Sequence, residues 1–182
     1  MSHTILLLPG LNNSGAGHWQ TLWEKLVPNA HRVQQQDWDT PQRADWVAAL
    51  DAEIAARDGA VTLVAHSLGC ALAAWWAAEH CADAQLSKVT GALLVAPPDV
   101  ERADFPVEEH GFAPMPRAAL PFRSIVVASS DDPWCALPKA RSWARDWGAD
   151  FHEIGARGHL NSESDLGNWE QGLTWLTKLT RC

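Results

Sequence analysis

A short apolar run passes directly into an alanine-rich stretch between Val61 and Ala78, and this junction constrains the fold more than any other part of the chain. The run begins Val-Thr-Leu-Val-Ala, which is the apolar, partly β-branched composition of a buried parallel strand. The residues after Gly69 have the composition of a buried helix. The sequence therefore predicts a strand that turns at once into a helix, as in sheets whose strands alternate with helices.

Ser67 lies at this junction, with the small residues Ala65 and Gly69 two positions to either side. A tight turn there would hold Ser67 in a strained backbone conformation and present its hydroxyl to solvent. The backbone N–H of Leu68 would be an unpaired donor at the start of the helix, directed at the place where an oxyanion could form. The pattern is typical of a nucleophile elbow, although Ala65 replaces the first glycine of G-x-S-x-G. The alternative is a buried serine in an ordinary turn.

Apolar segments alternate with helical patterns along the rest of the chain. Further strands are predicted at Thr4–Leu8, His31–Gln35, Val89–Ala96, Ser124–Ser129 and Phe151–Ile154, and helices at His18–Leu26, Arg43–Arg57, Leu137–Trp147 and Asn168–Leu179. Such alternation predicts a mostly parallel sheet with helices on both faces. We therefore expect a single domain over residues 1–182, built as a three-layer α/β sandwich with six strands. A chain of 182 residues is too short for a separate cap domain as well.

The segment from 99 to 123 is the only long one without clear periodicity, and it contains several prolines. Proline removes a backbone donor and interrupts both helices and strands. We expect a surface excursion with at most one helical turn, rather than a packed element, in a position where it could cover a site.

Composition and charge exclude several classes of partner. The formal net charge of −8 argues against nucleic acid and anionic membranes, because phosphate binding needs clustered Lys and Arg. No stretch is long enough to span a bilayer, and the N-terminal run breaks at Pro9 without a basic region, which predicts a strand and not a signal peptide. Cys70, Cys81, Cys135 and Cys182 have no metal-ligand spacing. We expect a reduced, cytoplasmic protein without a metal.

Residues suited to activate a serine follow two later strands. A serine hydroxyl is a poor nucleophile until a base removes its proton and a third group holds that base. Asp131 and Asp132 follow the fifth predicted strand, and His159 follows the sixth. Loops after parallel strands open at the same edge of a sheet, so we expect these residues to meet Ser67 there. Either aspartate could instead form a turn before Pro133.

Four further residues near these loops are candidates for supporting roles. The loop after the first strand should supply a second oxyanion donor, for which the backbone N–H of Leu11 is the candidate and a plain turn the alternative. His18 could face the site, but a role at the N-terminus of a helix is favoured. His66 is expected to aim its side chain away from the site. Cys70 is expected to pack inside the helix rather than react.

Four segments spread over nearly the whole chain add a more specific signal. They are Leu-Pro-Gly-Leu-Asn-Asn-Ser-Gly-Ala-Gly-His-Trp near the start, Val-Ala-His-Ser-Leu-Gly-Cys at the junction, Ser-Ser-Asp-Asp-Pro-Trp-Cys, and Gly-His-Leu-Asn-Ser-Glu-Ser. Together they resemble the small serine hydrolases similar to retinoblastoma-binding protein 9 and the bacterial YdeN-like proteins. The resemblance implies an α/β-hydrolase fold without a cap domain, a triad of Ser67, Asp132 and His159, and no cofactor. Asp132 is favoured over Asp131 because the acid in similar hydrolases usually precedes a proline.

The leading expectation is a hydrolase that cleaves small acyl esters, or thioesters or amides, through an acyl intermediate on Ser67. His159 would take the serine proton and then activate water, while Asp132 orients its ring. The partner would be a small-molecule acyl substrate, and the protein a monomer or weak homodimer. The alternative is a non-catalytic protein-binding module on a hydrolase scaffold, which an apolar patch of exposed tryptophans would favour.

Overall fold

The computed structural model describes residues 3–80, 84–106 and 110–181. Within this part of the chain one sheet has the strand order β2-β1-β3-β4-β5-β6, and every neighbouring pair is parallel. The strands are β1 (His3–Leu8), β2 (Ala30–Arg32), β3 (Ala60–His66), β4 (Val89–Val95), β5 (Arg123–Ala128) and β6 (Asp150–Glu153). The predicted six-stranded parallel sheet is confirmed.

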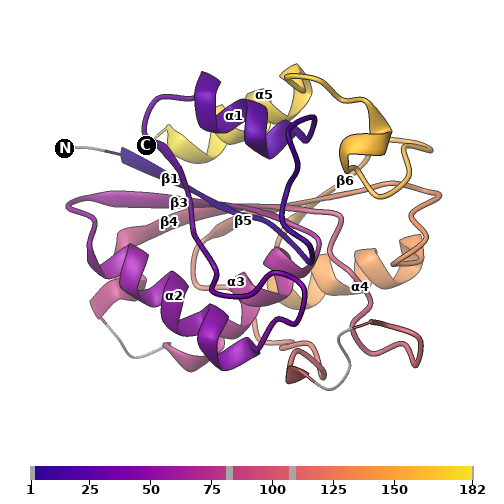
Figure 1. Cartoon of the computed structure of the whole chain (residues 1–182), viewed down its shortest axis with the longest axis horizontal. Helices are drawn as coiled ribbons and strands as arrows, with labels where there is room; N and C mark the ends of the chain where they lie inside the picture. Colours follow the sequence, from indigo (N-terminus) through magenta and orange to yellow (C-terminus); the bar gives the residue numbers. More distant parts are fainter. Residues whose placement is uncertain (1–2, 81–83, 107–109, 182) are drawn as a thin grey trace.

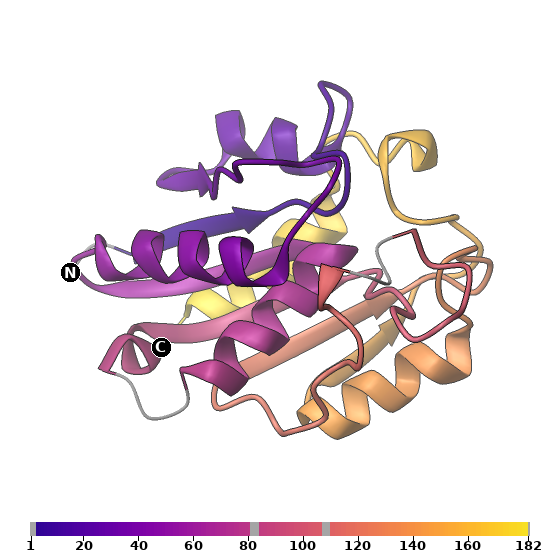
Figure 2. The same cartoon turned by 60° about the horizontal axis from the view of Figure 1, so that its bottom comes forward.

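Helices cover both faces of the sheet (Figure 1). One layer holds α1 (Trp19–Leu26) and α5 (Glu170–Thr180), and the other holds α2 (Arg43–Ala55), α3 (Leu68–Glu79) and α4 (Leu137–Trp147). Figure 2 shows this second layer in front of the strands. Among the described residues, the short 3-10 helices η1 (Ala84–Lys88) and η3 (Ser162–Ser164) lie in connections. The three-layer sandwich is therefore the one that the alternating pattern predicts.

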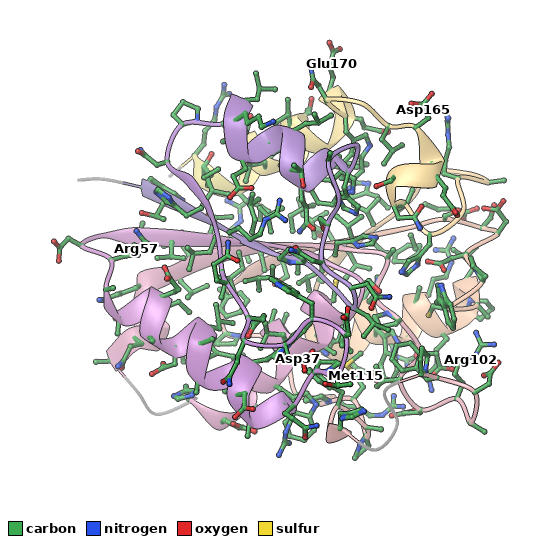
Figure 3. The ribbon with its side chains drawn as sticks, viewed as in Figure 1. Asp37, Arg57, Arg102, Met115, Asp165 and Glu170 are labelled. Atoms are coloured by element: carbon green, nitrogen blue, oxygen red, sulfur yellow. The ribbon has the colours of Figure 1, made fainter. Side chains whose placement is uncertain are left out.

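Tryptophan rings fill the space between the sheet and both helix layers. Trp46, Trp76, Trp143 and Trp147 lie in the core on the α2, α3 and α4 side, and Trp19, Trp23, Trp169 and Trp175 lie on the α1 and α5 side. Charged side chains such as Asp165 and Glu170 project outward from the ribbon instead (Figure 3). Among the described residues, Leu26 is the only large hydrophobic residue that is exposed. No helix in this part of the chain is long and apolar enough to cross a membrane.

In the described parts of the segment from 99 to 123 several side chains pack into the core, so the prediction of a surface excursion is wrong for these residues. Phe112 and Met115 are buried in the core that α2, α3 and α4 share. The indole N–H of Trp75 donates to the carbonyl oxygen of Phe112 at 2.8 Å, which ties the segment to α3. Prolines prevent regular secondary structure, but apolar side chains at irregular spacing still bury. Because these apolar side chains follow neither a helical nor a strand period, the sequence pattern does not reveal that they are buried.

The second strand is shorter and earlier than predicted, because Ala30–Arg32 replaces His31–Gln35. It is an edge strand that pairs with β1 alone. Edge strands are often short, and a three-residue strand is too brief for alternation to set its ends. The shift leaves the carboxyl edge of β1, where the site lies, unchanged.

Candidate active site

Ser67 occupies the turn between β3 and α3 in a conformation that non-glycine residues seldom adopt, with φ 53° and ψ −125°. The turn depends on close backbone approach at Gly69, where a Cβ atom would lie 2.1 Å from the carbonyl oxygen of Leu8. Gly10 also permits a close approach, because a Cβ atom at this position would lie 2.8 Å from Cβ of Ser67. The surrounding strand and helix thus hold the strained serine at the carboxyl edge of the sheet.

The side chains of Ser67, His159 and Asp132 meet at this edge. Oγ of Ser67 lies 2.8 Å from Nε2 of His159, and Nδ1 of His159 lies 2.9 Å from each carboxylate oxygen of Asp132. The Asp132 side chain is 3% exposed and the imidazole 10%. The backbone N–H of Trp134 also donates to Asp132 Oδ1 at 2.9 Å. The ring is therefore fixed with one nitrogen toward a buried carboxylate and the other toward the serine hydroxyl.

Asp131 points to a different set of partners. Its Oδ1 accepts the hydroxyl of Ser129 and the backbone N–H of Gly158, both at 2.7 Å. These bonds lower the pKa of the Asp131 carboxyl, the serine hydroxyl having the larger effect. Because Gly158 directly precedes His159, Asp131 ties the loop after β5 to the loop that holds the imidazole. The structure thus places Asp132, and not Asp131, against the ring.

Leu11 and Leu68, whose backbone N–H groups are the predicted oxyanion donors, both lie close to the turn at Ser67. Leu68 is the first residue of α3, so its N–H has no carbonyl within the helix to bind. Leu11 follows Gly10, whose Cβ would stand 3.1 Å from the Leu68 nitrogen, and it lines the same cavity as the serine. Within the described residues neither N–H donates to a backbone carbonyl. Both remain available to an oxygen atom beside the serine.

His18 and His66 extend the site as a row of imidazole rings. The ring centroids of His18 and His66 are 4.6 Å apart, and those of His66 and His159 are 4.9 Å apart. His18 is the N-cap of α1, where its Nδ1 accepts the backbone N–H of Gln20 at 3.2 Å, and it also lines the cavity. His18 therefore has the role at the helix N-terminus that the sequence favours, and it also borders the site, which was the alternative.

The prediction for His66 is wrong. His66 is one of the residues that line the cavity, its ring packs against the His159 ring, and its Nε2 donates to the backbone carbonyl oxygen of His159 at 2.8 Å. Alternation along a strand places neighbouring side chains on opposite faces. The positive φ at Ser67 ends that alternation, so both side chains reach the same cavity.

Both of these histidines are neutral at pH 7. Burial, together with the positive charges of Arg32 and His159, lowers the pKa of His18 to about 4. Burial, with the charges of His159 and His18, holds the pKa of His66 well below its usual range. The neutral rings therefore pack beside His159 without repelling it when it becomes charged.

A cavity of about 370 Å³ opens beside the serine hydroxyl. Its apolar lining residues are Leu11, Phe105, Pro106 and Trp134. The other lining residues besides the triad and His66 are mostly polar, namely Asn12, Asn13, Gly15, His18, Asn161, Ser162 and Glu163. Among the described residues that line it, none is Lys or Arg.

The cavity wall is where reasoning from the sequence missed most. Trp134 stands two residues after the candidate acid, and Asn161 two residues after the histidine. For Trp134 and Asn161 the only signal in the sequence was their position shortly after β5 and β6. Phe105 comes from the segment predicted to lie on the surface. No group of His, Cys, Asp and Glu within the described ranges could hold a metal ion.

The described cysteines are not activated. Burial raises the pKa of Cys70 well above its usual range, and burial with nearby carboxylates raises the pKa of Cys135 to about 12. A thiolate is the nucleophilic form of cysteine, so neither thiol is suited to act as a nucleophile at neutral pH. Cys81 and Cys182 lie outside the described residues.

The fold and the site together define a class of protein. A parallel α/β sandwich with a serine at a strained strand-to-helix turn, and an acid and a histidine after later strands, is an α/β-hydrolase. The sequence matches the serine hydrolase family over residues 5–178. The chain belongs to the serine hydrolase family, and it is an enzyme of that kind. No protein with a curated function matches the sequence.

Solved structures of hydrolases share the fold. A YdeN-like hydrolase from Pectobacterium atrosepticum is 29% identical, with 98% of this chain and 90% of that chain covered and a TM-score of 0.85. The ydeN gene product of B. subtilis is 17% identical, with 98% of each chain covered and a TM-score of 0.73. The carboxylesterase CesB of Bacillus subtilis is 12% identical, with 98% of this chain and 83% of that chain covered and a TM-score of 0.67. The expected resemblance to YdeN-like hydrolases is confirmed.

Proposed function

We propose that the protein hydrolyses small acyl esters through a covalent acyl intermediate on Ser67. The observation that supports this most directly is the unbroken line of contacts from Asp132 through His159 to Ser67 Oγ, with distances of 2.9 and 2.8 Å. A hydroxyl bonded to an imidazole, whose other nitrogen faces a buried carboxylate, is the arrangement that activates serine for acyl transfer.

Each group has one role in this reaction. Nε2 of His159 accepts the proton as Ser67 Oγ attacks the carbonyl carbon, and Asp132 faces the imidazolium that forms. The N–H groups of Leu11 and Leu68 donate to the oxyanion. His159 then gives its proton to the leaving alcohol. In the second half of the reaction His159 accepts a proton from a water molecule as this water attacks the acyl group, and the acid is released from Ser67.

The cavity favours small, uncharged substrates over large anionic ones. Thioesters and amides could react through the same groups, but acyl carriers that present phosphates are recognised by Arg and Lys. The cavity wall described above contains neither, and its charged member, Glu163, is acidic. A protein-binding module would instead present an apolar patch, whereas Leu26 is an isolated exposed side chain in the described part of the chain. A small-molecule acyl ester is therefore the proposed partner.

Labelling with a fluorophosphonate probe tests the proposal without knowledge of the substrate. The native protein should label, because the reagent requires an activated serine. Ser67→Ala should abolish labelling and reduce turnover of a para-nitrophenyl ester to the residual level that oxyanion donors and binding supply, roughly 10³ to 10⁴ over water. Ser130→Ala changes an exposed serine near the site and should label normally. Full labelling of Ser67→Ala would place the nucleophile elsewhere and contradict the proposal.

A further inference from the structure

One residue that lines the cavity has a side-chain atom without a hydrogen-bond partner. Five described side chains contain a buried nitrogen or oxygen atom without a hydrogen bond, and His18 is the one among them that lines the cavity beside Ser67. The atom is Nε2, and the residue as a whole is 3% exposed. Buried polar atoms in folded proteins nearly always have partners, so an exception at a binding cavity calls for a ligand.

The helix cap determines which protons His18 has. Its Nδ1 accepts the N–H of Gln20, so that nitrogen must present a lone pair. The ring is neutral at pH 7, as burial lowers its pKa to about 4. A neutral imidazole with a lone pair on Nδ1 carries its hydrogen on Nε2. The unpartnered atom is therefore a fixed hydrogen-bond donor without a charge.

The surroundings of this donor define the acceptor that would suit it. His18 lines the same cavity as Ser67 and His159, and the ring of His66 contacts both the His18 ring and the His159 ring. The described lining of the cavity contains Glu163 and no Lys or Arg, so a neutral donor there suits an uncharged oxygen better than a carboxylate or phosphate. Because one ring links His18 to His159, that oxygen would belong to a part of the substrate near the ester group.

We propose that His18 Nε2–H recognises an uncharged oxygen acceptor of the substrate, such as an ether or hydroxyl oxygen near the ester group, and so determines substrate specificity. This inference rests on the proposed esterase function and adds a substrate class to it. A site with a buried donor discriminates against analogues that lack the acceptor, because the donor is then left unpaired. The helix cap preserves the tautomer, which links the start of α1 to substrate choice.

Two pairs of esters of nearly equal shape test the proposal. The first pair, para-nitrophenyl methoxyacetate and butanoate, differs by an ether oxygen in the acyl part. The second pair, methoxyethyl acetate and butyl acetate, differs in the alcohol part. For each pair the ratio of kcat/KM values is divided by the ratio of hydroxide-catalysed rates, which removes intrinsic reactivity. In the native enzyme one pair should favour the ether about tenfold.

His18→Asn is the informative variant. Asparagine caps helices well, so α1 keeps an acceptor for the Gln20 N–H, but its shorter side chain loses the donor in the cavity. The tenfold preference should disappear in this variant. His31→Asn makes the same chemical change at an exposed position of β2 and should keep the preference.

The outcomes separate this inference from the proposed function. Fluorophosphonate labelling of the native enzyme and of His18→Asn reports the activated serine independently of substrate choice. Normal labelling with no ether preference in either pair overturns the role of His18 and leaves the esterase proposal standing. An equal loss on both members of each pair also overturns it, because the donor would then act on the reacting carbonyl and not on a substrate oxygen. The ether preference is measured on the native enzyme itself, so the proposal can be decided even if His18→Asn folds poorly.

Discussion

At the scale of single residues, two adjacent carboxylates have separate tasks. Asp132 faces His159 Nδ1, whereas Asp131 binds Ser129 and Gly158. Asp132→Asn should lower kcat by about 10⁴, because an amide cannot hold the imidazole in the tautomer that accepts the serine proton. Steady-state kinetics on a para-nitrophenyl ester would measure this loss.

Asp131→Asn is the matched control for that substitution. An asparagine Oδ1 can still accept the Ser129 hydroxyl and the Gly158 N–H, so kcat should fall by less than about tenfold. A large loss in Asp131→Asn together with a small one in Asp132→Asn would contradict the assignment of the acid. It would mean that the loop geometry, and not the carboxylate beside the ring, limits the reaction.

At the scale of elements, the contact between β1 and α3 positions the serine. A Cβ at Gly69 would lie 2.1 Å from the Leu8 carbonyl oxygen, and backbone cannot move aside as a flexible side chain does. Gly69→Ala should therefore destabilise the protein by about 3 kcal/mol or more, since it forces α3 away from the strand. Urea unfolding would measure the change in the free energy of unfolding.

Gly17→Ala serves as the control, because a Cβ there meets nothing within 4 Å. Its free energy of unfolding should stay within about 0.5 kcal/mol of the native value. If Gly69→Ala were equally harmless, the close approach of α3 to β1 would not be what fixes the turn at Ser67.

At the scale of the whole molecule, the neutral histidines couple folding to pH. His18 and His66 have pKa values below the reference of about 6.5 in the folded state and near it when unfolded. The unfolded chain then binds more protons, so stability is full above about pH 6.5 and falls as the pH drops toward 4. Protonation of His18 alone should lower the free energy of unfolding by about 3 kcal/mol over this pH window. Urea midpoints measured between pH 7 and 5 would show the early part of the loss.

His18→Asn should weaken this pH dependence, because the variant lacks one of the two groups and still caps α1. His31→Asn should leave the dependence as it is in the native protein. Unfolding midpoints of His18→Asn that fall with pH as steeply as those of the native protein would show that this ring is not held neutral by the fold.

The sequence by itself determined the parallel sheet, most of its strands and helices, and the position of Ser67. These features depend on local signals. Apolar runs define buried strands, residues three and four apart define a helix face, and a strand that passes directly into a helix leaves one residue at the turn. The parallel order then places Ser67 and the residues after β5 and β6 at one edge of the sheet.

Only the tertiary structure decided what those edge residues touch. The sequence offered two adjacent aspartates, and the path of the loop after β5 places Asp132 against His159. The turn at Ser67 brought His66 into the cavity against strand alternation, and irregular spacing hid the burial of Phe112. Each outcome depends on contacts between segments far apart in the chain. Such contacts follow from packing and loop geometry, which no local period or turn signal encodes.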